Sequence, residues 1–161
     1  MITQEKLKEL FHYAPETGIF TRLTNRGGKK PGTPVGAKHA MGYIQISIDS
    51  KLFKAHRLAW LYHHGAPIPA LIDHQDLDNS NNKISNLRAA TKQQNEFNQP
   101  KPSNNTSGYK GVSWHSIKKQ WRARTCLNGK EILFGYFDSP EEAYEVYKLK
   151  APQIHGEFFR E

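Results

Sequence analysis

An aspartate and histidine pair followed by an asparagine-rich run is the part of this chain best equipped for chemistry. The pair is Asp73 and His74, the run covers residues 79–82, and two further asparagines follow at Asn86 and Asn95. A histidine, with an ordinary pKa of about 6.5, can take a proton from water. The carboxylate of Asp73 and the amide oxygen of Asn95 are hard oxygen donors of the kind that Mg²⁺ prefers. Such a set could activate a water and neutralise charge on a phosphate, as the hydrolysis of a phosphodiester requires.

The segments around these residues are predicted to be two strands and a helix. Residues 71–74 have the pattern of a short apolar strand, and residues 87–90 have the pattern of a second. Thr91, with Gln94 three residues later, matches a capping box, which predicts a helix from there to about residue 97. In the order strand, loop, strand and helix, the first strand and the helix can pack face to face.

An asparagine-rich turn around an ordinary buried histidine is the simpler interpretation of this region. An aspartate and histidine pair alone would favour it. The ordered set that also contains Asn86 and Asn95, at a spacing that fits the predicted elements, favours a catalytic site instead. In that site Asn86 would fix the loop or the orientation of the imidazole.

The ordered set resembles the HNH endonucleases, which have a ββα-metal fold. The resemblance lies in Asp73-His74, Asn86-Leu87 and Asn95, and it covers about residues 40–99. It implies His74 as general base, Asp73 and Asn95 as metal ligands, and Asn86 as the residue that positions the base. The last motif position is often histidine in this family, and asparagine here favours one hard divalent ion over Zn²⁺. That ion would be Mg²⁺, with Mn²⁺ as the alternative.

Residues 55–60, Ala-His-Arg-Leu-Ala-Trp, also resemble a segment that commonly precedes the motif in phage members of the family. For His56 a structural role is favoured over a contact with a DNA phosphate. The pattern upstream predicts a helix over residues 3–12, a strand over 19–22, a hairpin from strands 43–48 and 52–55, and a helix over 56–64 that ends at Gly65.

Net charge and its placement favour a nucleic acid as the partner. The 161-residue chain has a formal net charge of +8, and a basic surface of this kind attracts polyanions. Seven basic and no acidic residues lie between positions 101 and 130, and eight basic residues opposed only by Asp49 lie between positions 22 and 57. The two stretches fit two surfaces that contact DNA. The alternative for the earlier stretch is a solvated loop, because residues 27–34 are rich in glycine and lysine.

Cysteine content and hydropathy exclude several classes of protein. Cys126 is the only cysteine, which excludes a multi-cysteine zinc site and an intramolecular disulfide. No apolar run approaches the roughly 20 residues that are needed to span a bilayer. We therefore expect a soluble protein of the cytoplasm, in a bacterial or phage-infected cell, with no membrane partner.

A second small module is predicted beyond a polar, proline-containing stretch at residues 98–107. Short strands are expected at residues 111–113, 121–127 and 131–137, with the hairpin signal Asn128-Gly129 between the last two. A helix should begin after Ser139, with proline at its first position, and Pro152 should end or kink it near Lys150. An apolar tail over residues 154–159 would follow.

This module resembles the DNA-binding domain of the plant APETALA and ethylene-response factors over about residues 107–160. The matching segments are Tyr109-Lys110-Gly111-Val112, Trp121-Arg122-Ala123-Arg124, Phe134-Gly135-Tyr136-Phe137-Asp138, Glu141-Glu142-Ala143-Tyr144 and His155-Gly156-Glu157-Phe158. The resemblance implies a sheet that lies in the major groove of DNA.

The residue pattern of the module agrees with a DNA-binding sheet. Arg122 and Arg124 should point to the same side of their strand, and arginine suits guanine edges and phosphates. For Trp121, a place in the core and a contact with nucleic acid both remain open. Contacts with the DNA backbone are predicted for Lys110, Trp114, Lys119 and Lys130.

Together these expectations describe an α+β protein with two modules. A ββα-metal (HNH) nuclease module with an N-terminal helix and hairpin covers residues 1–99, and a linker covers residues 100–107. A small three-stranded antiparallel sheet packed on one helix, over residues 108–161, is expected to bind double-stranded DNA.

The two resemblances imply a homing-type, metal-dependent endonuclease of phage type that nicks or cleaves duplex DNA at preferred sites. It would act as a monomer or as a dimer assembled on DNA. The alternative is a sequence-specific DNA-binding protein whose HNH module is inactive or structural. An RNA-binding basic protein ranks behind both.

Overall fold

The protein divides into two compact units, Met1–Ala90 and Thr91–Glu161. The computed structural model describes residues 2–25 and 27–161. Met1, at the start of the predicted nuclease module, and Arg26, in the earlier basic stretch, lie outside the described residues. Both units mix helices with small antiparallel sheets, which confirms the predicted α+β class.

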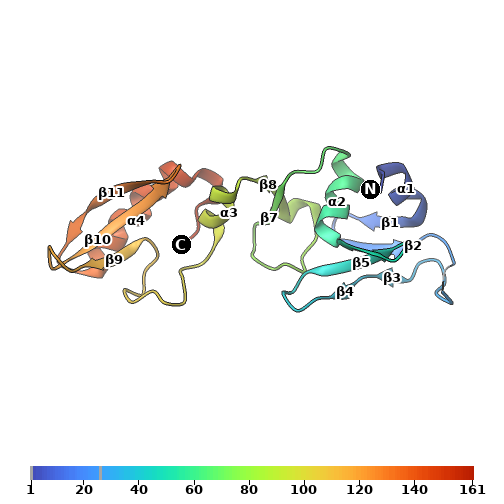
Figure 1. The fold of residues 1–161 in the computed structure, drawn as a ribbon, viewed down its shortest axis with the longest axis horizontal. Coiled ribbons are helices and arrows are strands. Elements are labelled where there is room, and N and C mark those ends of the chain that lie inside the picture. The colour runs from blue at the N-terminus through green and yellow to red at the C-terminus, as the bar shows by residue number, and fades with distance from the viewer. Residues whose placement is uncertain (1, 26) are drawn as a thin grey trace. The chain divides into compact units, whose positions relative to one another are not determined.

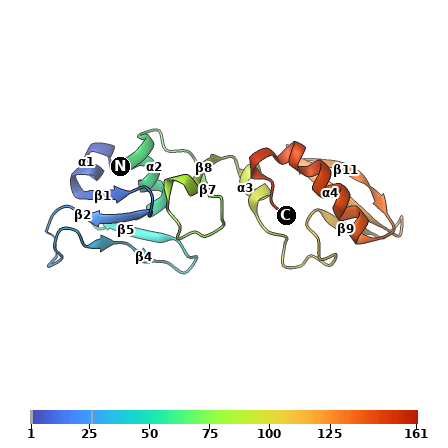
Figure 2. The ribbon, with the colours of Figure 1, turned by 180° about the vertical axis from the view of Figure 1, so that it is seen from behind.

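The first unit places two α-helices on the same side of its first five strands, as Figures 1 and 2 show. Its elements are α1 (Gln4–Leu10), β1 (Phe11–Ala14), β2 (Ile19–Arg22), β3 (Pro34–Val35), β4 (Ala37–Lys38), β5 (Ile44–Ile48), β6 (Lys51–Lys54), α2 (Ala55–His64), β7 (Leu71–His74), the 3-10 turn η1 (Ile84–Asn86) and β8 (Leu87–Ala90). The strands form sheets in the orders β1-β2-β3, β4-β5-β6 and β7-β8.

The first helix is shorter than the sequence predicts. Thr3 caps α1 by accepting a hydrogen bond from the backbone of Lys6, and Leu7 buries its side chain completely. The helix predicted to reach residue 12 ends at Leu10, because Phe11 and Tyr13 alternate inward and form β1. Burial of these two aromatic rings on one face of a strand outweighs the helical spacing of the residues before them.

The predicted hairpin and second helix are both confirmed. Asp49 and Ser50 join β5 to β6 with φ values of +48° and +63°, the left-handed pair that tight hairpin turns use. Helix α2 ends at Gly65, whose φ is +79°. Leu58, Ala59 and Leu61 of this helix lie in the core.

The β1–β2 turn supports the loop between β7 and β8. The hydroxyl of Tyr13 donates to the backbone oxygen of Asn82 at 2.7 Å, and the backbone NH of Ile84 donates to the oxygen of Pro15 at 3.2 Å. A Cβ atom on Gly18 would lie 2.4 Å from the carbonyl carbon of Asn82. The turn and the loop are therefore in direct backbone contact.

We expect Gly18→Ala to destabilise the first unit more than Gly32→Ala does. Both glycines have positive φ, +72° and +82°, but an added Cβ on Gly32 would have no atom of the described residues within 4 Å apart from its chain neighbours. The control should cost about 1–2 kcal/mol for the left-handed backbone alone. Gly18→Ala should cost a further 1–3 kcal/mol or so for the collision with Asn82. Urea unfolding, followed at NMR signals of the first unit, measures the free energy of unfolding of each variant. Equal losses of stability in the two variants would mean that the backbone near Asn82 can move to accept the added methyl group.

The second unit is a three-stranded sheet packed on one helix, as predicted (Figure 1). Its elements are α3 (Lys92–Asn98), β9 (Val112–His115), β10 (Gln120–Leu127), β11 (Lys130–Phe137), α4 (Pro140–His155) and the 3-10 turn η2 (Gly156–Phe158). The sheet has the order β11-β10-β9, and its core contains Val112, Ala123, Ala143, Tyr147 and Ala151. Asn128 and Gly129 form the predicted turn between β10 and β11, both with positive φ.

The prediction that Pro152 ends the last helix near Lys150 was wrong, and the kink predicted there as the alternative stays a prediction. Helix α4 continues through Pro152 to His155. Ala151 and His155 are both buried, so packing of the last turn compensates for the one backbone hydrogen bond that proline cannot donate. The apolar tail expected over residues 154–159 instead completes α4 and forms η2.

Helix α3 belongs to the second unit. The Phe97 ring stacks on His155 at a centroid distance of 3.8 Å. The predicted linker, residues 100–107, also lies inside this unit, where the amide of Asn105 and the hydroxyl of Ser107 both donate to the oxygen of Tyr109. The functional division between residues 1–99 and 108–161 stays a prediction. In the part of the chain that the structure covers, no helix is both long and apolar enough to cross a bilayer.

Candidate active site

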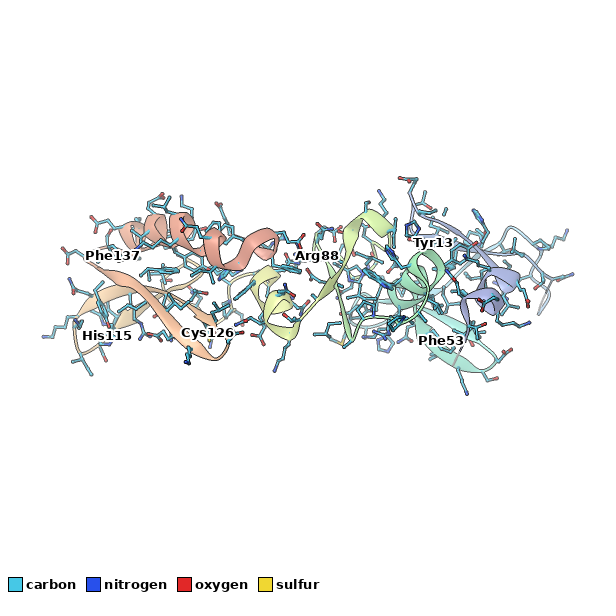
Figure 3. The ribbon with its side chains drawn as sticks, turned by 90° about the horizontal axis from the view of Figure 1, so that it is seen from above. Tyr13, Phe53, Arg88, His115, Cys126 and Phe137 are labelled. Atoms are coloured by element: carbon cyan, nitrogen blue, oxygen red, sulfur yellow. The ribbon has the colours of Figure 1, made fainter. Side chains whose placement is uncertain are left out.

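Asp73 and His74 form the end of β7 and are both buried. Their exposed fractions are 3% and 4%. Strand pairing places Asp73 opposite Arg88 of β8, which Figure 3 labels. Two nitrogens of the Arg88 guanidinium, Nε and Nη2, lie 2.9 and 2.8 Å from the same carboxylate oxygen, Oδ2. The carboxylate is therefore held in place by a cation from the neighbouring strand.

The imidazole of His74 faces the side chain of Asn82. His74 Nε2 lies 3.5 Å from Asn82 Oδ1. The Asn82 amide nitrogen donates to the oxygen of Ser80 at 3.0 Å, which fixes the amide so that its oxygen faces the histidine. An acceptor at Nε2 favours the tautomer with its proton on that nitrogen. With its proton on Nε2, the His74 ring would have Nδ1 as its basic nitrogen.

Burial keeps His74 in its neutral form. Removal from water lowers the pKa of the imidazole, while Asn82 and the carboxylates of Asp76, Asp73 and Asp78 oppose that shift. A neutral imidazole at neutral pH can accept a proton, as a general base must.

The hydrogen bonds described for Asn86 join it to the loop. Its side-chain oxygen accepts from the backbone NH of Asp76 at 3.1 Å, and its amide nitrogen donates to Asp76 Oδ1 and to the oxygen of Asn81, both at 2.9 Å. Asp76 Oδ2 in turn accepts from the Asn81 amide at 2.6 Å. Of the two roles predicted for Asn86, the geometry supports the first.

Asn82, Asp76 and His56 are site residues for which the sequence predicted no catalytic part. The asparagine-rich run was visible, but spacing alone does not tell which of its members faces the histidine. The His56 and His74 rings have centroids 5.0 Å apart, and the Tyr43 ring lies 5.3 Å from His56. These contacts come from α2 and from the residue before β5, elements far from the motif in the chain.

Asn95 lies on α3 and is half-buried there. The capping box predicted for this helix is present, with Thr91 accepting from the backbone of Gln94 and the Gln94 side chain accepting from the backbone of Thr91. Because α3 belongs to the second unit, the role of Asn95 as a metal ligand stays a prediction.

The ligands predicted from the sequence are oxygen donors, which suit a magnesium-type ion. Among the described residues, no group of three or more histidine, cysteine, aspartate or glutamate side chains could hold a metal. Mg²⁺ needs no such group, because it commonly takes one or two protein oxygens and fills its other positions with water and substrate phosphate. Asp73 and Asn95 would supply oxygens of this kind.

The two predicted arginines share the face of the second sheet opposite α4. Ala123 between them is fully buried, so Arg122 and Arg124 point away from the helix. Figure 3 shows His115 on this open side and Phe137 on the side of α4. Both arginines contact Glu131 of β11; Arg122 Nη1 lies 3.4 Å from Glu131 Oε1, and Arg124 Nη1 bonds the other carboxylate oxygen. One carboxylate thus balances part of the charge on this face.

Trp114 and Lys110 are placed differently from their predictions. Trp114 pairs with Trp121 across the β9–β10 ladder and therefore shares the face that α4 covers, although 48% of its surface is exposed. Trp121 packs against the core there. The Lys110 ammonium donates to the backbone oxygens of Phe97, Gln99 and Arg160. That ammonium holds the end of α3 to the C-terminal residues, which leaves it poorly placed for a phosphate.

The remaining predicted lysines are exposed. Lys119 lies in the turn before β10 with a φ of +53°, and Lys130 begins β11. Lys118, from the same basic stretch, has its ammonium 4.4 Å from the centre of the Tyr136 ring.

Sequence comparison places this site within a known family. A family profile described as HNH endonuclease matches residues 53–97. Protein 3.8 of Escherichia phage T7 is 35% identical over 109 residues, which is 66% of this chain and 88% of that protein. The chain contains an HNH endonuclease domain. A mimivirus relative, HNH endonuclease L560 of Acanthamoeba polyphaga mimivirus, is 32% identical over 115 residues, covering 70% of this chain and 59% of that protein.

The HNH homing endonuclease I-HmuI is similar in structure at a low level. The solved structure, titled for DNA binding and cleavage by that enzyme, is 22% identical with a TM-score of 0.45, covering 90% of this chain and 81% of that one. The family assignment depends on the sequence matches. The segment that matches the HNH endonuclease profile contains His56, Asp73, His74, Asn86 and Asn95.

Acid should lower the stability of the first unit through His56. Burial lowers the pKa of His56 to about 3, with smaller contributions from His74, Lys54 and Arg57. The unfolded chain takes up this proton below about pH 6.5. The free energy of unfolding should therefore be highest above that pH and fall toward pH 3, by up to about 1.4 kcal/mol per pH unit.

Comparison with His56→Phe isolates this contribution. Urea unfolding of the first unit at about pH 7 and about pH 5 should show a larger loss for the wild type than for the variant. The same pH dependence in both proteins would mean that His56 takes up its proton at the ordinary pH.

Proposed function

We propose that the chain is a metal-dependent DNA endonuclease that hydrolyses phosphodiester bonds, with site-preferring nicking or cleavage of duplex DNA. The observation that carries the proposal is the buried Asp73 and His74 pair, with the Asn82 amide oxygen 3.5 Å from His74 Nε2. A buried neutral imidazole beside a buried carboxylate suits acid and base chemistry on a phosphate.

In the proposed mechanism His74 acts as general base. Nδ1 takes a proton from a water whose oxygen forms a new bond to phosphorus. One phosphorus–oxygen ester bond breaks, and the oxygen that leaves takes a proton from solvent water. Asp73 and Asn95 would hold one divalent ion, Mg²⁺ or Mn²⁺, which supplies positive charge to the phosphate and the leaving oxygen when bound. Arg88 orients the Asp73 carboxylate, and Asn86 holds the loop that carries Asn82.

A plasmid assay tests this function. Supercoiled plasmid should be nicked or cut by the full chain with Mg²⁺ or Mn²⁺, and the reaction should stop when EDTA removes the ion. Sequencing of cleavage products from a random DNA pool then measures site preference, and the ratio of nicked to linear plasmid separates a single-strand cut from a double-strand break. DNA binding without cleavage in either ion would favour the alternative, a DNA-binding protein whose HNH module is inactive or structural.

We further propose that the second unit docks on double-stranded DNA through the open face of its sheet, like the APETALA-type domains that it resembles. Arg122, Arg124, Lys119 and Lys130 are the residues retained for this role. Trp114 and Lys110 are not retained, because the contacts described above engage Lys110 within the unit and turn Trp114 toward the α4 side. The chain would work as a monomer or as two copies assembled on DNA.

The variant Arg122→Ala with Arg124→Ala should weaken DNA binding and flatten its dependence on salt. Loss of two phosphate-neutralising cations should lower the slope of log K against log salt by about 2. Fluorescence anisotropy with a labelled duplex at several salt concentrations measures both quantities.

Glu131→Gln provides a control of opposite sign. Removing this carboxylate releases both arginines and removes a negative charge from the face, so the affinity for DNA should rise. An unchanged salt slope in the double variant, or no gain from Glu131→Gln, would contradict docking through this face.

A further inference from the structure

His56 is a buried polar residue in a helix whose other buried residues are apolar. Helix α2 buries Ala55, Leu58, Ala59 and Leu61, and it also buries His56, of which only 6% is exposed. Among the described residues, Nδ1 of this ring has no hydrogen-bond partner. An unsatisfied buried nitrogen costs about 1–3 kcal/mol. A leucine or phenylalanine would avoid that cost, so stability does not explain a histidine at this position.

The contacts of His56 point to His74. The two rings are 5.0 Å apart at an angle of 85°, so the edge of one faces the plane of the other. Tyr43 closes the group, with its ring 5.3 Å from His56 and 6.0 Å from His74. Asn82 contacts His74 at Nε2. The imidazole of His74 is therefore bounded by an amide at one nitrogen and by flat rings beside it.

We propose that His56 is a positioning residue that holds the imidazole of His74 in the orientation needed for proton transfer. A flat ring at right angles restricts rotation of its neighbour, which a flexible aliphatic chain would not do to the same degree. Burial lowers the pKa of His56 to about 3, so the positioning ring remains uncharged at neutral pH. This inference rests on the proposed role of His74 as general base.

The test compares His56→Leu, which removes the flat ring but keeps apolar bulk, with His56→Phe, which keeps a flat ring. His63→Leu is the matched control, because His63 is an exposed residue of the same helix. His56→Leu should lower kcat for plasmid nicking about 10-fold to 100-fold, with little change in KM for DNA. His56→Phe should restore most of kcat, and His63→Leu should match the wild type.

A second readout does not depend on cleavage. Ring-current shifts and nuclear Overhauser contacts of His74, measured by NMR in the full chain, should change in His56→Leu and stay close to wild type in His63→Leu. A folded His56→Leu protein with wild-type kcat, or with only KM raised, would overturn the proposal. So would a His74 ring that keeps its wild-type contacts in that variant. A wild-type chain that cuts no DNA would refute the proposed function, and the NMR comparison would still decide whether His56 positions His74.

Discussion

His74→Ala should lower the rate of DNA cleavage by about 10²-fold to 10⁴-fold, the range expected for loss of a general base. The imidazole is buried, neutral and oriented by Asn82, and alanine removes the only atom to which we assign the proton of the attacking water. DNA affinity should stay near that of the wild type, because the open face of the second sheet is unchanged. Nicking rates at saturating Mg²⁺, with binding measured separately on the same duplex, give both quantities.

His63→Ala serves as the matched control for this variant. It removes an exposed histidine from the same unit and should leave cleavage unchanged. Equal rates for His74→Ala and the wild type would eliminate His74 as the base. A parallel loss of DNA binding would assign the residue to docking rather than to chemistry.

Asp73→Ala should abolish cleavage and also destabilise the first unit by about 3–5 kcal/mol. The side chain of Asp73 is 2% exposed and that of Arg88 is 12% exposed, with nitrogen and oxygen 2.8 Å apart. Removal of the carboxylate leaves the Arg88 guanidinium mostly buried without that partner. Because a buried cation is costly when its counter-charge is lost, the effect on stability should be large.

The double variant Asp73→Ala with Arg88→Leu separates the two roles of the aspartate. It should recover much of the lost stability, since neither charge remains, and it should stay inactive, since the carboxylate for the metal is absent. Urea unfolding and plasmid nicking on the two single variants and the double variant complete the cycle. Recovery of cleavage in the double variant would show that Asp73 has a structural role alone.

Local sequence signals were sufficient for most of the elements. The alternation around Ile46, the left-handed turn at Asp49 and Ser50, the capping box at Thr91 and the turn at Asn128 and Gly129 are short-range features, and the structure contains each of them. The predicted end of the first helix was wrong because tertiary packing outweighed the local pattern. Burial of Phe11 and Tyr13 shortened α1.

The candidate site was predictable in part. Adjacent residues such as Asp73 and His74 stay together in any fold, so their pairing could be read directly from the chain. The apolar pattern also predicted the partner strand over residues 87–90. The ion pair between Asp73 and Arg88, however, depends on the register of the two strands, and a shift of one residue would break it. The contact between His56 and His74 joins residues 18 positions apart, and no local pattern encodes it.

For the predicted DNA-binding residues, too, the local pattern could not show contacts between residues on different strands or segments. Alternation along β10 correctly placed Arg122 and Arg124 on one face, but it could not reveal that Glu131 of the next strand would contact both. Nor could the sequence indicate that the Lys110 ammonium would be surrounded by backbone oxygens.

The central claim is that one hard divalent ion binds at the Asp73 carboxylate beside His74, and diffraction from crystals of the chain with duplex DNA and Mn²⁺ tests it most directly. We predict one anomalous peak bonded to the oxygens of Asp73 and Asn95, next to a DNA phosphate and within reach of His74. Manganese bound elsewhere, or a phosphate held with no ion at Asp73, would contradict the account.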